Sequence, residues 1–127
     1  MKHLLDVSVL LASIVENHSA NATAQAWLKG KQVVLCPIVE LGFLRISTNA
    51  TVPGMGFEMK QARASLDKFL NERNAERIAD DLPALHSHPT RSAEVMDQYL
   101  ADLASKHGLR FATLDARIKH LYVEMVR

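Results

Sequence analysis

Short apolar segments alternate along the chain with longer stretches in which apolar residues recur at helical spacing. This alternation constrains the fold more than any other feature of the sequence, because strands separated by helices usually return to one sheet in parallel orientation. The pattern predicts an α/β fold built on a parallel sheet. The predicted strands are residues 3–6, 33–36, 77–79, 110–113 and 121–123.

Helical periodicity accounts for most of the sequence between these segments. Pro37 suits the first turn of a helix, because its missing N–H would have no partner there. Clustered Pro and Gly residues indicate loops over 51–57 and 80–89. The predicted helices cover about 9–14, 20–28, 37–46, 58–74 and 92–104.

Length and composition restrict the domain organisation and the cellular setting. A chain of 127 residues, 48% of them hydrophobic, is the size of one domain, and the absence of a linker or repeat predicts a single unit over 1–127. The only cysteine, Cys36, cannot form an intramolecular disulfide, which favours a reducing cytoplasm. No apolar segment approaches the roughly 20 residues of a membrane span. We therefore expect a cytoplasmic protein without a membrane partner.

The formal net charge of +1 gives no global electrostatic reason to bind nucleic acid. The 15 basic residues are balanced by 14 acidic ones. Any surface that binds a polyanion must therefore be local.

Four acidic residues occupy positions where burial of an unpaired carboxylate would be costly. Asp6 closes the first predicted strand, Glu40 follows the second, and Asp115 follows the fourth. Asp97 lies among apolar residues of the helix predicted over 92–104. In a parallel sheet the carboxyl ends of the strands meet at one edge, where ligands bind. We therefore expect the first three acids at one site, with Asp97 joining them from the helix.

A hard divalent cation would explain why four carboxylates gather at one edge. Close carboxylates repel and raise one another's pKa unless a cation compensates them. Mg²⁺ accepts carboxylate oxygens and retains several waters. Mn²⁺ could substitute for it.

Each acid also has a purely structural interpretation. Asp6 and Asp115 could each cap a following helix. Glu40 could pair with Arg45 or another base, and Asp97 could face solvent. Glu94 and Asp102 are rival acids on the helix of Asp97, although Asp102 is turned well away from the Asp97 face. The conjunction of all four is harder to explain in this way than any one of them.

The segments that carry these acids resemble the acidic motifs of PIN-domain ribonucleases, and most closely those of VapC toxins from bacterial toxin–antitoxin pairs. The resemblance extends over about residues 3–123, with the motifs in the family's order. The four motifs are Leu-Leu-Asp-Val-Ser-Val-Leu-Leu-Ala, Cys-Pro-Ile-Val-Glu-Leu-Gly-Phe-Leu-Arg, Asp-Gln-Tyr-Leu-Ala-Asp-Leu-Ala and Ala-Thr-Leu-Asp-Ala-Arg. The fold that it implies is a three-layer α/β/α sandwich around a mostly parallel sheet of about five strands.

The resemblance also assigns roles to individual residues. Ser8 and Thr113 are expected to contact the acids or the substrate. An RNA backbone would also need positive charge, for which the candidates are Arg45, Arg63, Arg73 and Arg117. Arg45 and Arg117 are preferred because they fall near the acidic motifs. Lys119 stands near the place of a further acid in some family members, so one bound ion is expected. The implied metal-binding and catalytic acids are Asp6, Glu40, Asp97 and Asp115.

The implied activity is Mg²⁺-dependent hydrolysis of RNA phosphodiester bonds by an endoribonuclease toxin. An antitoxin that covers the acidic groove and a homodimer are the implied partners. One alternative is a phosphoacceptor signalling domain, but such domains have adjacent acids after the first strand, where this chain has only Asp6. The other is a non-catalytic module with the PIN fold.

Overall fold

A five-stranded parallel sheet lies at the centre of the fold. The structure is a computed structural model that describes residues 2–116 and 123–127. Within these residues the strand order is β3-β2-β1-β4-β5, and every pairing is parallel. The strands are β1 (Lys2–Leu5), β2 (Gln32–Leu35), β3 (Glu76–Arg77), β4 (Arg110–Thr113) and β5 (Val123–Met125). The predicted α/β fold with a parallel sheet is therefore confirmed.

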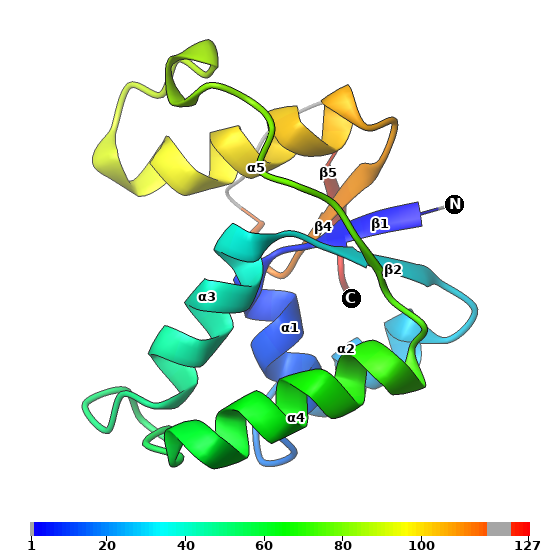
Figure 1. Ribbon diagram of the computed structural model, residues 1–127, viewed down its shortest axis with the longest axis vertical. Coiled ribbons are helices and arrows are strands. Elements are labelled where there is room, and N and C mark those ends of the chain that lie inside the picture. The colour runs from blue at the N-terminus through cyan, green and yellow to red at the C-terminus, as the bar shows by residue number, and fades with distance from the viewer. Residues whose placement is uncertain (1, 117–122) are drawn as a thin grey trace.

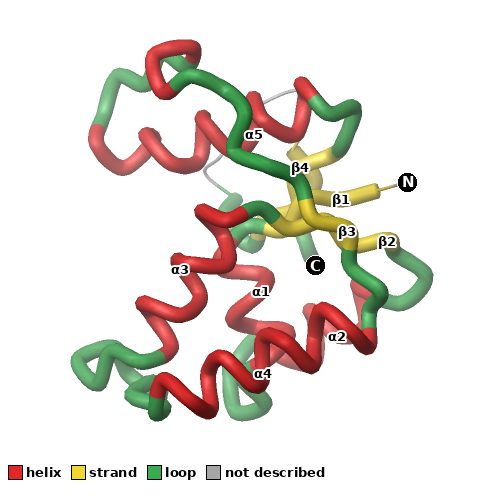
Figure 2. Tube along the Cα trace, viewed as in Figure 1, coloured by secondary structure: helices red, strands yellow, loops and turns green. Residues whose placement is uncertain are grey.

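The helices form layers on both sides of this sheet (Figure 1). In that view α5 lies above the sheet, whereas α1 to α4 lie below it, and the tube in Figure 2 shows the same division. The expected three-layer arrangement is thus present. The helices are α1 (Val7–Ile14), α2 (Asn21–Leu28), α3 (Pro37–Ser47), α4 (Met59–Glu72) and α5 (Val95–Lys106), with short 3-10 turns η1 (Ala84–His86) and η2 (Ser92–Glu94).

The strands at the two edges of the sheet differ from their predicted bounds. The strand predicted over 77–79 is the two-residue β3, which starts one position earlier. The strand predicted over 121–123 overlaps β5 only at Val123, and its first two positions lie outside the described residues. Edge strands are covered less completely than central ones, so their apolar pattern is weaker and their ends are harder to predict.

The core explains why the central strands are apolar throughout. Leu4 and Leu5 of β1 and Phe111 of β4 are fully buried, because helices cover both faces of the sheet. Phe43 of α3 packs into the same core. None of the helices described is long and apolar enough to cross a membrane.

The parallel topology brings the carboxyl ends of the strands and the first turns of three helices to one edge of the sheet. All described strands are parallel, so their carboxyl ends lie at the same edge, and α1 and α3 begin there because they follow β1 and β2 directly. Helix α5 leads into β4 through a short turn, so it runs back along the sheet and its first turn lies at that edge too.

Candidate active site

Asp6 stands at the carboxyl end of the central strand β1 and is 8% exposed. Its backbone N–H donates to the carbonyl of Ala112, which ties it to β4 (2.9 Å). Its Oδ1 accepts a hydrogen bond from the N–H of Val7 (2.7 Å), so Asp6 caps α1. The Ser8 hydroxyl donates to Oδ2 (3.1 Å). The capping interpretation is therefore confirmed for Asp6, but it uses only one carboxylate oxygen.

Thr113 connects Asp6 to the end of β4. This residue is completely buried, and its hydroxyl donates to Asp6 Oδ2 at 2.8 Å. The same hydroxyl oxygen accepts the N–H of Asp115 at 3.0 Å. Ser8 makes a parallel link, since its Oγ accepts the N–H of Leu114 (3.4 Å). Two hydroxyls therefore fix the orientation of Asp6 and of the backbone that carries Asp115.

The pKa of Asp6 is raised above its ordinary value. Burial is the main cause, and the neighbouring Asp115 carboxylate adds to it. The hydrogen bonds from Thr113, Ser8 and Val7 lower the pKa but do not offset burial. A buried acid beside a second acid is the kind of arrangement that a divalent cation would stabilise.

Glu40 lies in the first turn of α3 and is 7% exposed. Its partner is Arg77 at the end of β3, whose Nη2 donates to Oε1 at 2.7 Å and whose Nε donates to Oε2 at 3.4 Å. Glu40 therefore pairs with another base rather than with Arg45. This contact follows from the topology, because β3 lies next to β2 and ends beside the start of α3.

Asp97 is half-buried in the first turn of α5, at the same edge of the sheet by topology. Asp102, a rival acid on this helix, accepts a hydrogen bond from Ser87 at 2.5 Å. Glu94, the other rival, accepts bonds from Arg91. These contacts anchor the loop before α5 and engage the two rival acids.

The four predicted acids share one edge but do not form a closed cluster. Across residues 2–116 and 123–127, no three His, Cys, Asp or Glu side chains are close enough to hold one metal ion together. The structure brings Asp6 and Asp115 together, whereas Glu40 is held by Arg77. Mg²⁺ is often bound by only one or two carboxylates with water completing its shell. The hard oxygen donors of Asp6 and Asp115 therefore fit this ion, and a centre of four acids stays a prediction.

The arginines differ from the sequence prediction. Arg45 is exposed in the last turn of α3, about 7.5 Å along the helix axis from Glu40 and away from the acidic edge. Arg117 lies outside the described residues. Arg77, which was not among the predicted phosphate contacts, is at this edge. Its place beside Glu40 depends on the pairing of β3 with β2, which no local sequence signal encodes.

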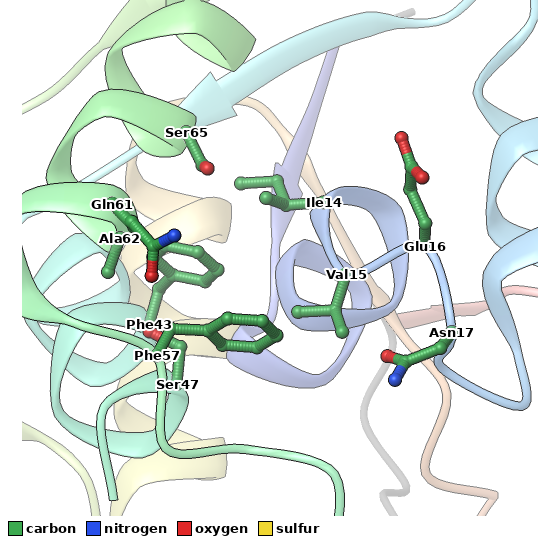
Figure 3. A pocket seen from close by; sticks show the side chains of 10 residues that line it. All are labelled: Ile14, Val15, Glu16, Asn17, Phe43, Ser47, Phe57, Gln61, Ala62 and Ser65. Carbon is green, nitrogen blue, oxygen red and sulfur yellow. The ribbon is translucent and has the colours of Figure 1, made fainter.

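Two hollows open on the α1 to α4 side of the sheet. One, of about 380 Å³, lies between the ends of α1 and α3 and the start of α4, where Phe43 and Phe57 face Val15 (Figure 3). It is remote from Asp6, which lies at the other end of α1. The other, here named the α3–α4 groove, measures about 340 Å³ and is lined by Pro37, Glu40, Leu41, Leu44, Arg63, Leu66, Asp67, Leu70 and Arg77.

Comparison with known proteins gives consistent matches over nearly the whole chain. The PIN domain family model matches residues 3–124. Ribonuclease VapC39 of Mycobacterium tuberculosis is 33% identical over 127 residues, covering 93% of this chain and 91% of the relative. Ribonuclease VapC38 of the same organism is 29% identical over 126 residues, covering 91% and 86%.

Two solved structures with a similar fold come from other bacteria. VapBC2 from Rickettsia felis, bound to a DNA fragment from its promoter, matches with a TM-score of 0.65 and 17% identity, covering 98% of each chain. FitAcB from Neisseria gonorrhoeae matches with a TM-score of 0.58 and 21% identity, covering 89% of this chain and 87% of that one. At these identities the likeness concerns the fold.

Proposed function

Because this chain belongs to the PIN-domain family, we propose that it is an Mg²⁺-dependent endoribonuclease that acts as the toxin of a toxin–antitoxin pair. The observation that carries the proposal is the buried Asp6 carboxylate, held by two hydroxyls beside Asp115 at the carboxyl edge of the sheet. The ribonuclease names of its VapC relatives support the choice of substrate.

The roles of the residues follow from their contacts. Asp6 and Asp115 would hold the ion, and Asp97 would approach from α5. Thr113 and Ser8 keep the Asp6 carboxylate in one orientation, so that it needs no rearrangement to accept a cation. When bound, Mg²⁺ would supply Lewis-acid polarisation of a phosphate oxygen and a more acidic bound water.

Glu40 is the candidate for water orientation and proton acceptance. It is buried at the same edge but is held by Arg77. A carboxylate in this position can orient a water molecule or accept its proton while Arg77 balances its charge.

The partners form the second part of the proposal. One similar solved structure is VapBC2 bound to a DNA fragment, and the VapC relatives share part of that name. We accordingly expect a cognate antitoxin that covers the acidic edge, a homodimer, and action on RNA in the cytoplasm.

The test of the activity is cleavage of an RNA panel under three conditions: with Mg²⁺, with a chelator, and with the Asp6→Asn variant in Mg²⁺. We expect cleavage only by the wild type with Mg²⁺, restored after chelation by added Mg²⁺ or Mn²⁺. Glu72→Gln, an exposed acid on α4, is the control variant and should cleave normally. Equal cleavage under all three conditions would identify a contaminating nuclease and defeat the proposal.

A non-catalytic module with the same fold would give a different result. Such a protein would bind RNA or a partner without cutting, even with Mg²⁺ present.

For an active enzyme, mapping the cleavage ends in total cellular RNA would identify the substrate. The choice of substrate depends on groove shape and loop contacts.

A further inference from the structure

The α3–α4 groove opens beside Glu40 at the same edge of the sheet as Asp6. Its polar lining consists of two arginines and two acids, Arg63 and Arg77 against Glu40 and Asp67. The charges therefore balance when both acids are ionised. Loss of one negative charge would make the groove attractive to a polyanion.

Arg77 is the cation best placed to bind such a ligand. A guanidinium has five N–H donors in a planar fork. Two N–H groups of Arg77 are directed at Glu40, and three are not used by that carboxylate. The side chain of Arg77 is 63% exposed, whereas that of Glu40 is 9% exposed. The guanidinium can therefore contact the carboxylate on one side and a ligand in the groove on the other.

The chemistry of this arrangement favours a phosphate group. Arginine binds phosphate through paired, charge-assisted hydrogen bonds, and most contacts that position nucleic acid are made to phosphates. Arg63, exposed on α4, supplies a second cation in the same groove. Leu41, which is 64% exposed, offers an apolar surface for a sugar or base.

We propose that Arg77 binds a backbone phosphate of single-stranded RNA in the α3–α4 groove, and that Glu40 weakens this binding by holding the same guanidinium. The inference rests on the proposed function, since it names a substrate contact of that site. It also gives the Glu40–Arg77 pair a second role, in which one acid sets how strongly the groove retains RNA.

The experiment measures binding without cleavage. A fluorescently labelled single-stranded RNA is titrated in chelator, and anisotropy gives the dissociation constant of each variant. We expect Arg77→Ala to weaken binding about tenfold, the effect of losing one good charge-assisted contact. The salt dependence should also fall, by about 0.7 in the slope of log K against log salt for one single-strand phosphate. Arg77→Lys keeps the charge but not the planar set of donors, so its dissociation constant should lie between those of the wild type and Arg77→Ala.

Lys2→Ala is the matched control. Lys2 also forms an ion pair with a glutamate, Glu76, at 2.7 Å, but it lies at the start of β1 on the opposite edge of the sheet. Its loss removes the same charge from the protein, so binding should change less than about twofold if local contact rather than net charge decides affinity.

The double variant tests the coupling between Glu40 and Arg77. We expect Glu40→Gln alone to tighten binding several-fold, and to give no gain when Arg77 is already alanine. In Arg77→Ala alone, Glu40 is left buried without its partner, which destabilises the fold. The double variant avoids this because glutamine replaces the buried acid. An equal gain from Glu40→Gln in both backgrounds would overturn the inference, because it would show a general charge effect.

The outcomes separate this inference from the proposed function. If the wild type cleaves RNA but Arg77→Ala binds it as tightly as the wild type, the inference fails and the function stands. Failure of the wild type to bind RNA in chelator would also overturn the inference. If the wild type shows the expected binding pattern but never cleaves, the proposed function fails and the phosphate contact stands.

Discussion

Thr113→Val offers the sharpest test of how the site is held together. Valine has nearly the shape of threonine, so the change removes only the hydroxyl that donates to Asp6 at 2.8 Å. A hydrogen bond to a charged group contributes about 1.5–3 kcal/mol. The second contact, from the Asp115 N–H, adds little because Asp115 is half-exposed and water can replace it. We expect an unfolding free energy lower by about 1.5–3 kcal/mol at neutral pH, or roughly 6–12 °C in Tm.

The pH dependence of this loss identifies its cause. Burial raises the pKa of Asp6, and loss of the Thr113 donor raises it further. A protonated carboxyl depends less on donors, so the deficit should grow as pH rises through the folded pKa of Asp6. Urea denaturation across a range of pH measures it. Thr113→Ser, which keeps the hydroxyl, should show no such pH dependence, and a valine variant as stable as the wild type at high pH would refute the reasoning.

Three further predictions concern single residues. Asp6→Asn should become more stable relative to the wild type as pH rises. The pKa of Asp6 is raised in the folded state, so the stability that its protonated form contributes is fully present below the unfolded pKa and is lost as pH rises through the folded pKa. Metal-free melting curves across pH should show the difference in stability widen, and a constant difference would count against the prediction. Gly42→Ala places a methyl group 2.8 Å from Cγ2 of Val7. Alanine gains about 1 kcal/mol of helix propensity over glycine, but the steric overlap should outweigh it, so we expect the free energy of unfolding in urea to fall by about 1–2 kcal/mol. A stabilised variant would contradict the tight contact of α1 and α3. Burial raises the pKa of the Cys36 thiol to about 12, so Ellman's reagent should react with it only after unfolding, and rapid reaction of the native protein would show that the thiol is accessible.

The central strands could be predicted well from the sequence, because the residues that form them are also the apolar residues of the core. The segments that became β1, β2 and β4 are buried on both faces, so they are continuously apolar and end abruptly. The two-residue β3 could not be predicted in this way. Both of its residues are exposed, and its place in the sheet is set by pairing with β2 rather than by its own composition.

The candidate site was predictable to a similar extent. Asp6 and Asp115 follow apolar strands, and parallel topology brings strand ends together, so their proximity follows from the pattern. The Glu40–Arg77 pair joins side chains 37 positions apart. Its formation depends on which strand lies next to β2, and a single sequence does not encode that order in any local signal.

The hydrogen bond between Thr113 and Asp6 spans 107 positions of the chain. During synthesis Asp6 therefore leaves the ribosome long before the hydroxyl that orients it. A nascent or truncated chain that lacks β4 would carry Asp6 without the hydroxyl that orients it. The order of strands in the sheet thus keeps the candidate site incomplete until translation has passed Thr113.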